Sequence, residues 1–327
     1  MGFKVTSSTK SESSNAPKID YNALNEYVVE TAGLQDPETV VGYVSMIVDL
    51  GNQAQEDAEV PFAGSDDEET AELAKKTNSY FKDGIDEKTK KPNRLFCYPQ
   101  PDKQAVAIAV DFPDILVDKG QFFGDSNPLP LRLWLGGSFF LGVDIGMVVA
   151  RPTFLKENTK LGNNKWSLDQ KNVLYQMAVS AGLVKPGEVF RPNQIDQLLG
   201  TAHQFSAQVC FNEHKGKQYY NEKLKFVGKL GRGQISPELL TTPHLIQLDE
   251  DNEEDAVKFL PHFVVNTIKR ANNFEGSKLQ EQLANRTYDK PAEEKKEAPV
   301  AVAPTKAKPV AKKSPVVEDD EDLTSPF

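Results

Sequence analysis

The sequence predicts an α+β chain built around a small five-stranded β-barrel. Three observations predict this fold. Short apolar runs alternate with Gly, Pro and Asn between residues 94 and 232, which favours strands. On both sides of this segment the apolar spacing fits helices. The segment also ends in two strand-like runs joined by a short turn. The 327 residues suffice to bury such a core.

The N-terminal region is predicted to be acidic and helical. Residues 1–18 are polar and Ser-rich, which is typical of a disordered segment. From Tyr21 to Leu50 apolar residues recur at helical spacing, and Asp36 and Pro37 fit an N-cap followed by Pro at the first helical position. Residues 19–93 therefore form the expected helical flank of the core.

The order of elements in the core predicts an OB-like barrel over residues 94–232. Strands are expected near 94–98, 104–111, 130–141, 145–155, 202–213 and 217–228. A capping-box spacing from Ser167 to Gln170 predicts a helix that ends near Ala181, before the last two strands. Several strands, a helix and a closing hairpin follow one another in this way in an OB-fold.

The C-terminal part is predicted to change from a helix to a linker. Residues 233–290 contain an acidic loop and a helix expected from Ala256 to about Leu283. From Pro291 the chain is rich in Pro, Ala, Lys, Glu and Val without a regular period, which indicates a disordered linker over 291–327. This linker ends in the acidic stretch EDDEDLTSPF.

Charge is segregated along the chain. The formal net charge of −10 would argue against a nucleic-acid partner. Residues 94–232, however, hold 17 Lys and Arg against 12 Asp and Glu, a net charge of +5. Residues 1–93 have 9 against 18, and residues 233–327 have 12 against 18, giving −9 and −6. The basic centre is thus the candidate for contact with an anionic polymer.

The alternation of side chains along each strand of the basic region, here called strand parity, predicts a surface that combines cations with aromatic rings. Alternate residues of a strand point to opposite sides, so each of three predicted strands places a cation and a ring on one face. Single-stranded nucleic acid is bound by this combination, because rings stack on bases and cations follow the phosphates. The predicted binding residues are Arg94, Phe96, Tyr98, Arg132, Trp134, Lys215, Lys217, Tyr219, Lys223 and Lys225. Lys160 and Trp166, in the loop before the helix, would extend this groove, although a solvated loop is the favoured explanation for the lysine. For any single strand the alternative is a surface cation–π pair.

No catalytic signature accompanies this surface. The histidines have no metal-ligand spacing with Cys97 or Cys210, and the sequence has no GxSxG, P-loop or GxGxxG motif. We therefore expect no enzyme activity, no cofactor and no metal. FFLGVDIG resembles the first-acid signature of ribonuclease-H-like nucleases at Asp144, which leaves a metal-dependent nuclease as a minor alternative. A structural or assembly protein is the other alternative.

The last ten residues resemble the C-terminal tip of bacterial and tailed-phage single-stranded DNA-binding proteins. Those tips combine an acidic run with a terminal Pro-Phe or Phe, and the segment FSAQVCFNEHKGKQYYNEKLKFVGKL resembles the closing hairpin of the phage proteins. The resemblance implies an OB-fold and a tail read by replication and recombination proteins, such as a polymerase, helicase-primase, nuclease or recombinase. The residues implied in partner binding are Glu318, Asp319, Asp320, Glu321, Asp322, Pro326 and Phe327.

A cytoplasmic location is expected, in the host cell if the chain is phage-encoded. No secretory segment follows Met1, and no apolar run approaches the length of a membrane span. The sequence leaves homo-oligomerisation open.

Overall fold

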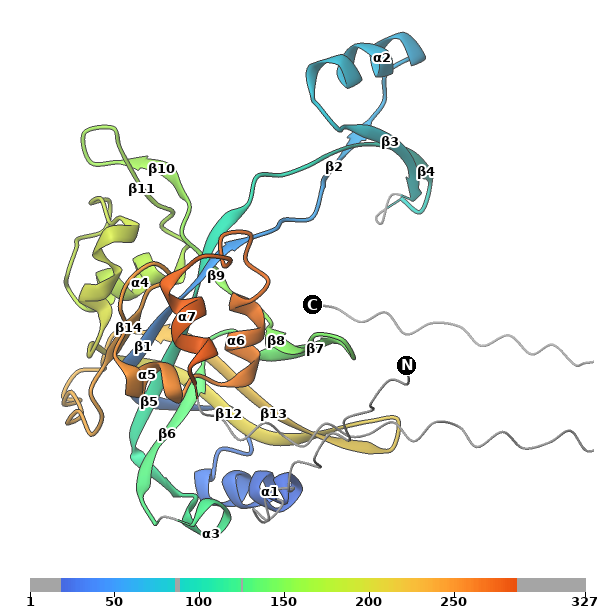
Figure 1. Ribbon diagram of the computed structural model, residues 1–327. Helices are drawn as coiled ribbons and strands as arrows, with labels where there is room; N and C mark the ends of the chain where they lie inside the picture. Colours follow the sequence, from blue (N-terminus) through green and yellow to red (C-terminus); the bar gives the residue numbers. More distant parts are fainter. Residues whose placement is uncertain (1–18, 86–88, 125, 287–327) are drawn as a thin grey trace, which may run out of the picture. The chain divides into compact units, whose positions relative to one another are not determined.

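A computed structural model describes residues 19–85, 89–124 and 126–286 of the chain (Figure 1). Its elements, in chain order, are α1 (Tyr21–Ala32), β1 (Glu38–Gln53), β2 (Ala58–Phe62), α2 (Asp66–Lys75), β3 (Tyr80–Ile85), β4 (Pro92–Tyr98), β5 (Lys103–Asp118), α3 (Gly120–Phe123), β6 (Pro128–Trp134), β7 (Ser138–Gly142), β8 (Gly146–Val149), β9 (Thr153–Phe154), β10 (Glu157–Leu161), β11 (Lys165–Leu168), α4 (Val173–Ser180), the 3-10 helix η1 (Pro192–Leu198), β12 (Ala202–His214), β13 (Lys217–Gly228), β14 (His244–Ile246), α5 (Glu254–Lys258), α6 (His262–Ile268) and α7 (Lys278–Ala284).

Five antiparallel strands form a nearly closed barrel in the order β13-β12-β1-β5-β6. The two edges of this sheet meet, because Gly137, just beyond β6, lies against the backbone of β13: a Cβ on it would be 3.3 Å from the Glu222 carbonyl oxygen. The third and fourth barrel strands, β6 and β12, are separated in the chain by α4. This order and helix placement are OB-like, so the predicted α+β class with a five-stranded barrel is confirmed.

Apolar side chains cover both faces of the central barrel strands. An interior cluster fills the barrel with residues such as Ile108, Leu133 and Phe205. An exterior cluster lies on the other face, where Ala107 and Trp134 pack against α5, α6, α7 and β14. The barrel wall is therefore sandwiched between its own interior and the C-terminal helices.

The helix predicted between Asp36 and Leu50 is wrong, because this segment forms the long strand β1. Val40, Val44 and Ile47 point to the interior, while Met46 and Val48 belong to the exterior cluster. A strand buried on both faces has a continuous apolar run, in which helical spacing occurs by coincidence. Its β-branched residues fit a pleated sheet better than a helix. The barrel thus begins at residue 38, not at the predicted boundary at residue 94.

A separate three-stranded sheet, in the order β2-β4-β3, is inserted between the first two barrel strands. Its aromatic side chains form a small cluster in which the rings of Phe62, Phe81, Phe96 and Tyr98 follow one another at centroid distances of 4.9–5.5 Å. The predicted strand near residues 94–98 exists, but it belongs to this sheet and not to the barrel.

The single helix expected from Ala256 to about Leu283 is three short helices, α5, α6 and α7. Pro261 occupies the N-cap of α6, and Gly276 adopts a left-handed φ of 82° just before α7. Proline lacks a backbone N–H and cannot continue a helix, and a glycine with a left-handed φ commonly ends one. The apolar spacing therefore runs through the whole segment, although the helix is interrupted twice.

Candidate nucleic-acid interface

The β12–β13 hairpin brings four of the predicted binding lysines together on one structural unit. Both strands were expected at nearly these bounds, and a two-residue turn joins them at Lys215 and Gly216, whose φ values are 51° and 70°. Such a turn requires two positive φ angles and matches the twist of a hairpin. The interior side of β13 carries Leu224 and Phe226, so Lys223 and Lys225 necessarily lie on the exterior side.

Exterior positions of this hairpin combine cations with one aromatic ring. Lys223 lies opposite Gln208, Lys225 opposite Ser206, and Tyr219 opposite Asn212. Tyr219 is 51% exposed, and the predicted lysines at 215, 217, 223 and 225 are exposed as well. None of the four lysines forms an ion pair with a described residue. Their charges are therefore available to a ligand.

The one acid of β13 does not cancel these charges. Glu222 points to the opposite side of the strand, where the hydroxyl of Tyr220 donates a 2.5 Å hydrogen bond to its carboxylate. Burial raises the pKa of Glu222, although this hydrogen bond and the charge of Lys119 act in the other direction. The carboxyl is thereby shifted towards its neutral form and separated from the exterior lysines.

Trp134 lies in the core and not on an accessible surface. Its parity was predicted correctly, since it faces the exterior of the barrel with Arg132. However, α6 covers that face, so Trp134 is 5% exposed and meets the ring of Phe263 edge to face at 5.8 Å. Base stacking on this ring would require α6 to leave.

Arg132 is held by a buried carboxylate. Its Nε and Nη2 atoms donate hydrogen bonds of 2.7 and 2.8 Å to Asp111, which also accepts from Ser45 and Thr241. Burial acts to lower the pKa of Arg132, but the hydrogen bonds and charge of Asp111 outweigh it and the pKa is raised. This fork joins β5 to β6, which gives Arg132 a structural partner within the barrel wall.

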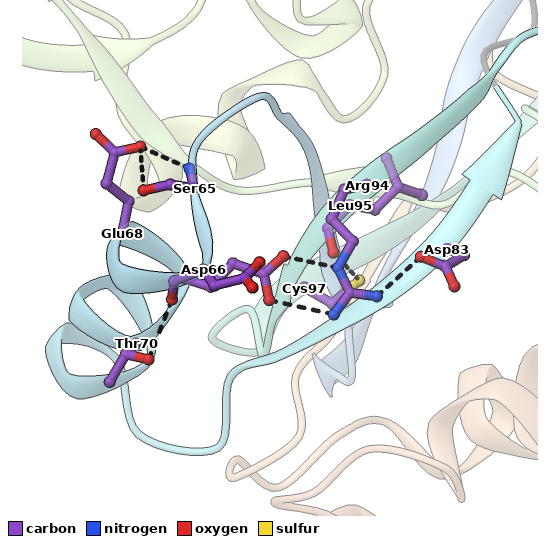
Figure 2. Close-up of polar contacts among 9 residues, drawn as sticks. Ser65, Asp66, Glu68, Thr70, Asp83, Arg94, Leu95 and Cys97 are labelled. Atoms are coloured by element: carbon purple, nitrogen blue, oxygen red, sulfur yellow. Dashed lines mark hydrogen bonds and ion pairs between the residues drawn. The ribbon is translucent and has the colours of Figure 1, made fainter.

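Arg94, Phe96 and Tyr98 lie on β4 of the inserted sheet and not on the barrel. Figure 2 shows the Arg94 guanidinium between two carboxylates, with Nε 2.8 Å from Glu69 and Nη1 2.8 Å from Asp83. Phe96 is buried in the aromatic cluster, and the Lys76 ammonium lies 3.0 Å from the centroid of Tyr98. The predicted shared surface of all three strands is therefore not formed by neighbouring barrel strands.

A second exposed ring with a cation occurs on the β10–β11 hairpin. Trp166 is 48% exposed, and Lys160, its partner across the hairpin, places its ammonium 4.9 Å from the indole centroid. Nearby, a shallow cavity of about 570 Å³ is lined by Lys103, Lys156 and Lys171 together with Phe154. These positions form a second basic region with an aromatic, in the connection that precedes α4.

Sequence reasoning overlooked the apolar tip of the β7–β8 hairpin. Six large side chains there are 37–87% exposed: Phe139, Phe140, Leu141, Val143, Ile145 and Met147. The sequence of this apolar run indicates only a strand, because the alternation of side chains does not tell which side of a strand lacks a neighbour.

The structure does not bring together a set of nuclease acids. Asp144 is exposed in the turn between β7 and β8, whereas Asp111 is buried in the barrel wall against Arg132. Across the described ranges, no group of three or more His, Cys, Asp and Glu side chains could hold a metal ion. In the same part of the chain, no helix is long and apolar enough to cross a membrane.

The acidic tip at residues 318–327 lies outside the described residues. Comparison of the chain with family models, with curated proteins and with solved structures finds no match.

Proposed function

We propose that the protein binds single-stranded DNA without sequence preference, protects it during replication, recombination and repair, and recruits partners through its acidic C-terminal tip. The observation that supports this proposal best is the exterior of the β12–β13 hairpin. Four lysines that form no ion pair with any described residue share this surface with Tyr219 on an OB-like barrel, a fold in which the loop between the last two strands commonly contacts nucleic acid.

The tip would act as a sensor of occupancy. Its five acids are attracted to the same lysines that bind phosphates, so the tail competes weakly with DNA. A bound strand displaces the tail, which leaves the Phe327 ring available to an apolar pocket with a basic rim on a partner protein. A large tailed-phage single-stranded DNA-binding protein would have this organisation.

A titration of a fluorescein-labelled oligo(dT) strand at two salt concentrations tests the proposal. Fluorescence anisotropy is the suitable signal, because Trp134 is buried and would not report contact with bases. Affinity should fall steeply as salt rises, since binding releases counterions from the strand. Absence of binding at low salt would overturn the proposal.

An assembly or docking protein is the second candidate, favoured by the exposed apolar tip of the β7–β8 hairpin. Contiguous exposed apolar surface is common at protein interfaces. Such a protein would ignore single-stranded DNA at any salt concentration, so the same titration separates the two functions.

A further inference from the structure

The β7–β8 hairpin presents apolar side chains on both of its faces. Phe140 lies opposite Met147, and Phe139 lies opposite Val148, so the two rings point to alternate sides of the two-stranded sheet. Phe140 is 61% and Phe139 is 44% exposed, and Val143 at the turn is 87% exposed. An isolated two-stranded hairpin is marginally stable in water, so exposing this much apolar surface on one requires external support.

Helix α6 supplies that support. The side-chain amide of Asn266 donates hydrogen bonds of 3.0 and 2.9 Å to the carbonyl oxygens of Ile145 and Met147. The next residue, Thr267, accepts a 2.8 Å hydrogen bond from the backbone N–H of Val149. Three hydrogen bonds with one helix thus hold β8 and the turn before it, and Val148 on β8 is 1% exposed, while Phe139 and Phe140 on β7 stay exposed. The hairpin is held in place before any ligand binds.

Two cations that form no ion pair with a described residue lie near the base of the hairpin. Gly137 lies against the backbone of Glu222, whose neighbour Lys223 is one of the exposed lysines on the exterior of β13. A Cβ on Gly136 would meet the backbone carbonyl oxygen of Arg151 at 2.4 Å, so this exposed arginine begins directly beside the hairpin. No described residue forms an ion pair with Arg151.

We propose that the β7–β8 hairpin is an apolar wedge that enters between two neighbouring bases of a single strand. Phe139 contacts the base on one side of the wedge and Phe140 the base on the other, while Lys223 and Arg151 hold the flanking phosphates. Apolar side chains of this kind unstack base steps when they are inserted between them. This inference rests on the proposed function, and it assigns the stacking rings to residues that parity did not identify.

The charges favour a nucleic acid over a second copy of the chain as the occupant. A protein interface commonly has an apolar centre and a polar rim of mixed character. Here Lys223 and Arg151, close to the base of the wedge, are exposed and form no ion pair with a described residue, whereas the carboxylate of Glu222 is turned to the other face of β13. A strand offers bases and phosphates at the required alternation.

Two oligonucleotides of equal length test the wedge, one of oligo(dT) and one with abasic sugars in place of the thymidines. Phe139→Ala/Phe140→Ala in the full chain should bind oligo(dT) about tenfold more weakly per ring lost, because stacking contributes about 1–3 kcal/mol per base. Its affinity for the abasic strand should equal that of the unaltered protein. Phe123→Ala/Phe259→Ala is the matched control, since these rings are 55% and 64% exposed on α3 and after α5, and it should leave both affinities unchanged.

Three outcomes would overturn the wedge, and they are distinguishable. Equal affinities of the unaltered protein and the Phe139→Ala/Phe140→Ala variant for oligo(dT) would refute insertion of the hairpin between bases and leave the proposed function intact. Equal losses on both strands would indicate a general structural effect. A variant that binds normally but no longer self-associates in sedimentation would assign the hairpin to a second copy. No binding by the unaltered protein would instead defeat the proposed function. As a second measurement, Phe140→Trp should lose fluorescence on oligo(dT) and keep it on the abasic strand, after the signal of the unaltered protein on the same two strands is subtracted as the contribution of Trp134 and Trp166. Equal fluorescence on both strands would refute contact between position 140 and a base.

Discussion

Replacing Lys223 and Lys225 with glutamine should reduce the salt dependence of DNA binding in a calculable way. These two and the lysines at 215 and 217 are exposed and unpaired among the described residues, so each can neutralise one phosphate. For single strands the slope of log affinity against log salt is about −0.7 per phosphate contact, so the four hairpin lysines contribute about −2.8 and the two that remain in the variant contribute about −1.4. Through these lysines alone, a rise from about 50 to about 200 mM salt weakens binding about 50-fold in the unaltered protein and about 7-fold in the variant.

Anisotropy titrations of labelled oligo(dT) at four salt concentrations measure both slopes. The charge-matched control is Lys258→Gln/Lys269→Gln, which removes the same charge from exposed positions on the C-terminal helices. The control should keep the slope of the unaltered protein. If the variant and the control changed the slope equally, the lysines of β13 would act only through net charge, and the interface would lie elsewhere.

The substitutions at Lys223 and Lys225 should leave the stability of the fold unchanged. Lys223 and Lys225 lie on the exterior of β13 opposite Gln208 and Ser206, where glutamine fits a strand without burying a polar group. Surface substitutions of this type change the free energy of unfolding by about 0.5 kcal/mol or less. Equal melting temperatures of the three proteins would show that a difference in slope reports binding.

Three other predictions test the core and the tail. His203 is buried between two hydroxyls, and burial lowers its pKa to about 4. The unfolded chain therefore binds a proton at this histidine below about pH 6.5, whereas the folded chain binds it only below about pH 4. The free energy of unfolding should fall by about 2 kcal/mol between pH 7 and pH 5 because of this difference. In urea unfolding, His203→Gln should lack this part of the decrease, and the same pH dependence in the variant and the unaltered protein would contradict the prediction. Trp134→Phe should lower the melting temperature through lost contact with Phe263 and leave oligo(dT) affinity unaltered, whereas a large loss of affinity at an unchanged melting temperature would assign the indole to the ligand. Deleting Glu318–Phe327 should leave oligo(dT) affinity equal or higher while abolishing pull-down of replication proteins, and weaker DNA binding by the truncated chain would refute competition by the tail.

The closing hairpin could be predicted from the sequence almost residue by residue, and the first barrel strand could not. Burial alternates along β13 from Glu222 to its end because one face is buried and the other is solvated, so period and structure agree there. In β1 both faces are buried, one by the barrel interior and one by helices from more than two hundred residues later. A continuous apolar run carries no period, so Val40, Val44 and Ile47 matched a helix as well as a strand.

The candidate site shows the same limit. Parity correctly placed Lys223, Lys225 and Trp134 on exterior faces, but parity does not tell whether another element covers that face. Trp134 is covered by α6, whereas no element covers the exterior of the β12–β13 hairpin near Lys223 in the described structure. The rings of the β7–β8 hairpin show the reverse case. An apolar strand is normally expected to pack against a neighbour, but these rings are exposed, so the sequence did not indicate them as candidate binding residues.

Helix α6 accounts both for the unexpected burial of Trp134 and for the exposed β7–β8 hairpin. In OB-folds the face of the second and third strands commonly receives the ligand, and here these strands are β5 and β6. The small side chains of Ala107 and Ala109 let the C-terminal helices approach this face closely, and the ring of Phe263 covers Trp134. From the same helix, Asn266 holds the β7–β8 hairpin by its carbonyl groups. Helix α6, which covers the face that usually binds the ligand, therefore also holds the apolar β7–β8 hairpin beside the exposed lysines of β13. Under the proposed function, the DNA strand contacts this hairpin and these lysines instead of the face of β5 and β6.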